Sequence, residues 1–236
     1  PLPNGNVLIL ASQDISLAEA TAAGFDPAVV GSTGVKVDYV VEVEPTGPTS
    51  GDIVWEWYLM DHLVQDFNPA ADNYGVVEDH PELIDANWHI TAYYDWTHAN
   101  AIAYNAELDQ IAICSRTFGE VWIVDHSTTK SEAAGHTGGN SGMGGDILYR
   151  WGNPQTYRAG TPDDQMLWGP HNIHWIEPGL PGAGNLMIYN NGWNRPEGQY
   201  STVVELTTTV DHTGQYPRPE PETPHGPANF TWSYGA

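Results

Sequence analysis

Short runs of β-branched and aromatic residues, bounded by Gly, Pro, Asn and Asp, recur along the whole chain. One set of similar runs lies at residues 53–57, 147–151 and 230–234. A second set lies at residues 40–43, 121–124 and 203–206. The starts lie 94 and 83 positions apart in the first set, and 81 and 82 apart in the second. Two sets with one period of about 80 residues indicate an internal repeat.

Each repeat contains short strand patterns and no long stretch with the helical period, which favours four antiparallel strands per unit. A third set of runs, at 6–10, 110–114 and 185–189, fits the same order. In the middle unit we predict strands at 98–104, 110–115, 121–125 and 147–151, and the next unit opens at 171–176. The one helix we predict spans 15–23, with Asp14 or Ser12 as its cap, inserted between strands.

Four-stranded repeats of this kind are typical of β-propeller blades. We therefore predict an all-β chain, a partial β-propeller over residues 1–236. Its blades are expected at about 1–60, lacking the innermost strand, at about 95–152 and at about 168–236. Propellers typically need four to eight blades to close a ring. We expect the remaining blades from the same chain, or from further copies, because an open stack would expose apolar faces.

Charge and composition limit which molecules the protein can bind. Thirty acidic against seven basic residues give a formal charge of −23, which repels nucleic acid and anionic lipid. No apolar run approaches the roughly 20 residues that span a bilayer, so we expect no membrane segment. Cys114, the single cysteine, is expected to be a buried small apolar residue. The composition favours an exported protein, periplasmic or extracellular.

The acidity itself is most simply explained by solubility or a saline habitat. Cation binding is an alternative, because acidic residues gather after the first 53–57 run. They are Asp61, Asp66, Asp72, Glu78, Asp79 and Glu82. The chain has no Asp-x-Asp-x-Asp-Gly calcium loop, so this indication is weak.

The candidate chemistry lies where two repeats begin. In a propeller the first strand of each blade lines the central channel, which would place His98, Asn100 and Arg116 near the axis. His171 occupies the equivalent position about one repeat later. We expect the two imidazoles to face one cavity from adjacent blades.

These segments resemble the bacterial arylsulfate sulfotransferase family, six-bladed propellers that move a sulfuryl group between phenols without a nucleotide donor. The resemblance covers nearly the whole chain. It lies in the Leu-Pro-Asn-Gly-Asn opening at 2–6, the Ile-Val-Trp-Glu-Trp closure at 53–57, the His-x-Asn element at 98–100, the Ser-Arg pair at 115–116 and the Gly-Pro-His-Asn turn at 169–172. It implies about three of six blades in this chain, with phenols and aryl sulfates as substrates and no cofactor.

The resemblance further implies that His171 becomes transiently sulfated, while His98, Asn100 and Arg116 hold the sulfuryl oxygens and assist the leaving phenolate. We assign Asn172 and His174, which follow His171 closely, to substrate binding, and no residue to a metal. One family histidine, from an earlier blade, has no safe counterpart; His62 is a poor candidate because it follows an outermost strand.

A propeller that only binds a ligand or protein is the alternative function. A metal-dependent hydrolase would need histidine and carboxylate ligands that converge, for which Asp95, His98 and His171 are the only plausible set. The Gly-rich stretch 135–145 is expected to be a flexible loop, and the Pro-rich stretch 217–227 an extended surface loop. For each of the other histidines considered by itself, a structural role is the more economical interpretation. They are His62, His80, His89, His126, His136, His174, His212 and His225.

Overall fold

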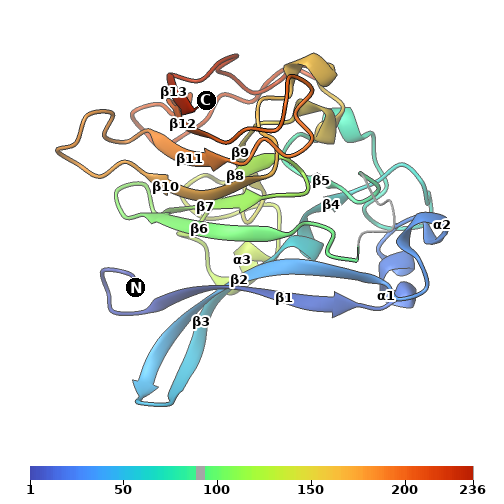
Figure 1. The fold of residues 1–236 in the computed structure, drawn as a ribbon. Coiled ribbons are helices and arrows are strands. Elements are labelled where there is room, and N and C mark those ends of the chain that lie inside the picture. The colour runs from blue at the N-terminus through green and yellow to red at the C-terminus, as the bar shows by residue number, and fades with distance from the viewer. Residues whose placement is uncertain (89–93, 236) are drawn as a thin grey trace.

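Antiparallel sheets of consecutive strands make up most of the protein, seen here in a computed structural model that describes residues 1–88 and 94–235. The first sheet contains β1 (Val7–Ile15), β2 (Val35–Gly47) and β3 (Ser50–Tyr58). The second contains β6 (Ala99–Asn105), β7 (Gln110–Ser115), β8 (Glu120–Asp125) and β9 (Ile147–Trp151). The third contains β10 (Pro170–Trp175), β11 (Leu186–Asn190), β12 (Thr202–Leu206) and β13 (Trp232–Gly235). Figure 1 shows the second sheet between the other two.

The middle sheet explains why the central residues of some strands are apolar on both faces. All residues of β7 and β8 are buried. Side chains alternate along a strand, so Ile111 and Ile113 join the core shared with the first sheet. Ala112 and Cys114 point the other way, into the core shared with the third sheet. A strand covered on both faces has no polar side, which produces the continuous apolar runs.

Strand order fixes which segments meet. Consecutive strands pair in order within each sheet, so β1, β6 and β10 form one edge and β3, β9 and β13 the opposite edge. β6 contacts both β1 and β10. The chain segments that enter β6 and β10 are therefore neighbours in space although the whole second sheet lies between them in sequence.

The remaining elements are short. The helices are α1 (Leu17–Ala22), α2 (Pro27–Val30) and α3 (Lys130–Ala133). The 3₁₀ turns are η1 (Leu59–His62), η2 (Val77–Asp79), η3 (Pro154–Tyr157) and η4 (Pro162–Asp164). β4 (Leu63–Val64) and β5 (Ile84–Asp85) form a small parallel pair. In the part of the chain that the structure describes, no helix is long and apolar enough to cross a membrane.

The predicted all-β class is confirmed, and each predicted strand run overlaps an observed strand. The predicted run 230–234 starts two residues too early, since β13 begins at Trp232. The Phe230 ring instead packs edge-on against Trp151, with 5.4 Å between the ring centroids. Cys114 is buried as predicted, and burial raises the pKa of its thiol. The division into blades stays a prediction, and His89 lies outside the described residues.

The predicted helix exists between two strands, but the prediction of its cap was wrong. Ile15 still belongs to β1, and Ser16 caps α1. The Ser16 hydroxyl accepts from the Glu19 amide at 3.3 Å, and the Glu19 carboxylate accepts from the Ser16 amide at 2.9 Å. This reciprocal pair satisfies two helix-end donors, which neither Asp14 nor Ser12 is placed to do. Sequence analysis did not predict α2 or α3.

Three of the six acidic residues after β3, namely Asp66, Glu78 and Glu82, form ion pairs with distant arginines. Asp66 accepts two hydrogen bonds from Arg158, at 2.6 and 2.9 Å, and Glu82 accepts one from Arg218 at 2.6 Å. Among the described residues these carboxylates form no group of three at metal-ligand spacing. The region therefore ties loops together through charge.

Candidate active site

Two predicted histidines meet where β6 and β10 begin. The ring centroids of His98 and His171 lie 6.3 Å apart, with the ring planes inclined at 57°. His98 has a φ of +44°, a left-handed conformation that is uncommon for residues other than glycine. Such backbone outliers persist where the surrounding structure holds them, often at functional sites. The chain thus turns sharply as it enters β6, next to His171.

A carboxylate orients His98. Asp95 Oδ2 lies 2.6 Å from His98 Nδ1, and Asp95 Oδ1 lies 3.0 Å from the Lys36 ammonium. The hydrogen bond to Asp95 raises the pKa of Lys36. Because the carboxylate can only accept from Nδ1–H, His98 Nε2 is left for proton transfer. An imidazole held by a carboxylate in this way is the arrangement used by general acids and bases.

His171 is held through its Nδ1 atom. Asn191 Nδ2 lies 2.8 Å from Nδ1 and donates to the Gly169 carbonyl at 2.7 Å, and that carbonyl lies 3.2 Å from Nδ1. The amide of Asn191 can donate only to an unprotonated Nδ1, whereas the carbonyl can accept only from Nδ1–H. A proton on Nδ1, donated to Gly169, leaves a lone pair on Nε2. Nε2 is therefore the nitrogen suited to nucleophilic attack.

Arg116 supplies a positive charge that forms no ion pair with a described carboxylate. Five of the seven cationic side chains form ion pairs with described carboxylates, from Lys36 to Arg218. Arg116 instead lies over the Trp193 ring, its guanidinium carbon 4.4 Å from the centroid. Its backbone amide donates to the His98 carbonyl at 3.2 Å, which couples the end of β7 to the start of β6. In a protein this acidic, an arginine with no ion pair among the described residues is available to bind an anion.

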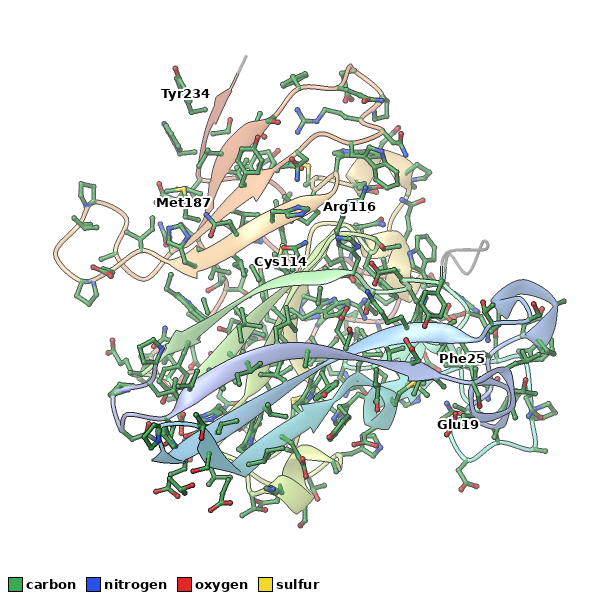
Figure 2. The ribbon with its side chains drawn as sticks, turned by 60° about the horizontal axis from the view of Figure 1, so that its bottom comes forward. Glu19, Phe25, Cys114, Arg116, Met187 and Tyr234 are labelled. Carbon is green, nitrogen blue, oxygen red and sulfur yellow. The ribbon has the colours of Figure 1, made fainter. Side chains whose placement is uncertain are left out.

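Arg116 and His171 line a common cavity of about 400 Å³. Tyr189 and Trp193, both partly exposed, contribute aromatic surface to the same cavity. Figure 2 shows Arg116 near the junction of the second and third sheets, while Tyr234 projects from the far edge of the third sheet. A cation, a nucleophilic nitrogen and aromatic walls together suit an aromatic ring that carries an anionic group.

Asn100 lies where the sequence predicts but has a different set of contacts. Its Nδ2 donates to the Pro170 carbonyl at 3.0 Å and lies 3.4 Å from the His98 carbonyl, so its N–H groups are already used. Its Oδ1 is buried and has no hydrogen-bond partner among the described residues, as is also true of the Thr117 hydroxyl. Sulfuryl oxygens only accept hydrogen bonds, so they gain nothing from Oδ1. In this arrangement Asn100 fastens β6 to β10 beside His171.

The other two predicted binding residues lie outside the cavity lining. Asn172 is exposed with a φ of +52°, and His174 is exposed with its Nδ1 3.4 Å from the Asn172 carbonyl. Their assignment stays a prediction. Sequence analysis missed Asn191 and Trp193, although the Asn-Asn-Gly-Trp turn that follows β11 repeats the position of Arg116 after β7.

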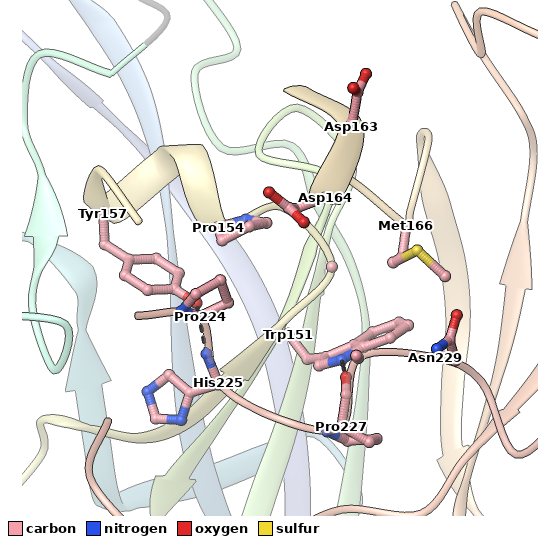
Figure 3. A pocket seen from close by; sticks show the side chains of 12 residues that line it. Trp151, Pro154, Tyr157, Asp163, Asp164, Met166, Pro224, His225, Pro227 and Asn229 are labelled. Carbon is pink, nitrogen blue, oxygen red and sulfur yellow. Dashed lines mark hydrogen bonds between the residues drawn. The ribbon is translucent and has the colours of Figure 1, made fainter. Parts of the chain in front are cut away.

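Neither of two other candidate sites gains support. The set Asp95, His98 and His171 is not a ligand group, since among the described residues three ligand atoms converge only at His62, His136 and Asp146. A second cavity, of about 280 Å³, is lined by Pro224, His225 and Pro227 of the Pro-rich loop (Figure 3). This loop was predicted to lie extended on the surface, but its His225 is buried. Asp164, a carboxylate in the lining of this cavity, is already engaged, because it accepts hydrogen bonds from the Thr161 amide and hydroxyl at 2.7 and 2.8 Å.

Comparison with known proteins identifies the family of the chain. A model of the Arylsulfotransferase (ASST) family matches residues 1–213 of the 236, so the chain belongs to the arylsulfotransferase family. A search of curated proteins finds no match. Membership places the chain among transferases of sulfuryl groups, whose substrates are phenols and aryl sulfates.

Proposed function

We propose that the chain forms part of a β-propeller that transfers a sulfuryl group from an aryl sulfate to a phenol, with His171 as the covalent carrier. The observation that carries the proposal is that His171 lines one cavity with Arg116 and lies beside the ring of His98. The aromatic walls at Tyr189 and Trp193 suit the aryl group of the substrate.

The reaction divides into two displacements. His171 Nε2 attacks the sulfur, the bond between sulfur and the aryl oxygen breaks, and the leaving oxygen takes a proton from His98. A second phenol then gives its proton to His98 and attacks the sulfur, which breaks the sulfur–nitrogen bond and restores His171. Covalent catalysis of this kind replaces one difficult step with two easier ones and gives ping-pong kinetics.

Arg116 acts on charge in the transition state. Sulfuryl transfer resembles phosphoryl transfer, in which a loose transition state spreads negative charge over the equatorial and leaving oxygens. A guanidinium beside those oxygens stabilises the transition state more than the ground state. Asp95 assists by holding the His98 ring through Nδ1, which leaves Nε2 for proton transfer.

The propeller and its location are part of the same proposal. The neighbouring edge strands β1, β6 and β10 suit the inner wall of a ring, and apolar residues remain exposed on the outer sheets. They include Val7, Ile9 and Ile53 on the first sheet and Trp232 and Tyr234 on the third. Further blades, or further copies, would cover them. We place the protein in the periplasm or outside the cell.

Turnover with defined substrates tests the proposal. The complete protein should release nitrophenolate from 4-nitrophenyl sulfate at a rate that rises with added phenol, with parallel lines in double-reciprocal plots. His171→Ala should reduce phenol-dependent release to background, and His212→Ala, at an exposed site elsewhere, should leave it unchanged. Full turnover in His171→Ala would instead support the propeller that only binds ligands.

A further inference from the structure

A second histidine cluster lies at the opposite edge of the sheets from the candidate active site. His62 ends η1 after the edge strand β3, His136 lies in the loop after α3, and Asp146 directly precedes the edge strand β9. Sequence analysis assigned no metal ligand and expected both histidines to be structural. The fold nevertheless brings one potential ligand atom from each residue within 4.8 Å of the others.

One carboxylate oxygen joins the two rings. Asp146 Oδ1 lies 2.9 Å from His62 Nδ1 and 2.7 Å from His136 Nδ1. His62 is fully buried and Asp146 nearly so, whereas 58% of the His136 side chain is exposed. The cluster is therefore rigid on its inner side and accessible from solvent on its outer side.

The His62 ring is fixed by its surroundings. Its Nε2 donates to the Ala133 carbonyl at 2.9 Å, and the ring stacks on Trp57 with centroids 5.5 Å apart and planes 6° apart. Trp57 in turn donates to the Gly145 carbonyl at 2.7 Å. A Cβ at Gly145 would lie 2.7 Å from His62 Nε2, so the chain passes as close to the ring as glycine allows. Metal-binding histidines typically donate their second N–H to a carbonyl in this manner.

The hydrogen-bond partners of His62 require a positive charge at this cluster. Because Ala133 can only accept, the proton of a neutral His62 sits on Nε2, and the Nδ1 lone pair then faces the carboxylate. Two lone pairs at 2.9 Å repel unless a positive charge stands between or beside them. The charge comes either from a second proton on the buried ring or from a metal ion. A metal ion would engage both Nδ1 atoms and the carboxylate at once, and one potential ligand atom from each residue already lies within 4.8 Å of the others.

We propose that His62 Nδ1, His136 Nδ1 and the Asp146 carboxylate bind a zinc-class divalent ion. Two imidazoles and one carboxylate are ligands that zinc accepts and calcium does not favour. Bonds of about 2.0–2.1 Å place tetrahedral ligands about 3.3 Å apart, so the ligands must separate by about half an ångström. The exposed His136 side chain can provide that movement. His136 also lines a cavity of about 350 Å³ together with Asp61, from which water or an exchangeable ligand would fill the fourth position.

The ion would join two segments that are remote in sequence, one with His62 and one with His136 and Asp146. Asp146 is 84 positions from His62 and 10 from His136. Bound metal therefore links the first sheet to the second through their outer edge strands. Because the ligand set forms only on folding, the metal should raise the thermal stability of the protein.

Metal binding by the complete, chelator-treated protein tests the inference independently of sulfuryl transfer. Calorimetry with Zn²⁺ and elemental analysis should give one ion per chain, Co²⁺ should produce the visible absorption of a tetrahedral site, and a hundredfold excess of Zn²⁺ over Kd should raise Tm by about 5–10 °C. His136→Ala, at an exposed position that folding does not need, should abolish all three signals. The matched variant His212→Ala should retain them.

Two results would overturn the metal site. One is Zn²⁺ binding that is equally strong in His136→Ala, which would assign the ion to other surface groups. The other is failure to bind Zn²⁺ stoichiometrically, together with ¹⁵N NMR signals of a His62 ring protonated on both nitrogens in the presence of Zn²⁺. That combination would identify the cluster as a buried imidazolium–carboxylate pair.

Discussion

The rings of His98 and His171 lie 6.3 Å apart, although they belong to different sheets and stand 73 positions apart in the chain. They meet because β6 and β10, the first strands of their sheets, contact each other. Asp95 engages Nδ1 of one ring and the Gly169 carbonyl engages Nδ1 of the other, so each ring has one nitrogen left for chemistry.

Arg116→Ala should slow sulfation of the enzyme far more than it weakens donor binding. The charge that Arg116 meets is largest in the transition state, and losing one such group costs about 10²–10³ in rate. Rapid-quench measurement of the first turnover separates the two effects. Arg195→Ala is the matched control, because Arg195 also stacks on an aromatic ring, that of Tyr200, but does not line the cavity. Equal losses in both variants would remove the special role of Arg116.

His98→Ala should discriminate between leaving groups. A nitrophenolate departs without a proton, whereas an alkylphenolate needs one, so the variant should lose activity mainly with poor leaving groups. Rates for a series of substituted phenyl sulfates give the slope of log rate against leaving-group pKa, which should become steeper. An unchanged slope would show that His98 is not the acid.

Glu120→Gln should destabilise the fold strongly. Glu120 and Arg150 are fully buried and joined by hydrogen bonds of 3.0 and 2.5 Å, and Arg150 also donates to Thr156 at 2.8 Å. Breaking a buried pair leaves an uncompensated charge and costs about 3–5 kcal/mol. Lys130→Ala, which breaks the exposed pair with Glu56, should cost less than about 1 kcal/mol. Urea unfolding measures both, and similar losses would contradict this account.

His225 should make the protein sensitive to acid. Burial, with a smaller contribution from Arg150, lowers its pKa to about 3 from the model-compound value of 6.5. The unfolded chain therefore binds a proton below pH 6.5 that the folded state refuses, and stability falls by about 1.4 kcal/mol per pH unit between pH 6.5 and 3. His225→Gln should flatten the difference between unfolding curves at pH 7 and pH 4. A parallel pH dependence in both proteins would mean that His225 is not the cause.

Local patterns predicted the strands because each sheet is built from consecutive segments. The alternation within 110–115 did not indicate which face meets which core, since both faces of that strand are apolar. The histidine pair was predictable for a further reason: a repeat places equivalent residues at equivalent positions, so His98 and His171 needed no knowledge of tertiary contacts.

The supporting residues were not predictable in this way. Asn191 and Trp193 belong to a turn whose conformation places them against His171 and Arg116, and no periodicity specifies a turn. His62, His136 and Asp146 lie in loops outside the repeat, where nothing in the sequence indicates convergence. Ser16 replaced the predicted caps because β1 continues to Ile15, a boundary set by pairing with β2.

The central claim is that His171 carries the sulfuryl group, and mass spectrometry tests it most directly. The complete protein, given an aryl sulfate without acceptor and digested under alkaline conditions, should gain about 80 Da on the peptide that contains His171, and phenol should remove it. The label should be absent in His171→Ala and present in His212→Ala. A label on another residue, or one that persists in His171→Ala, would contradict the account.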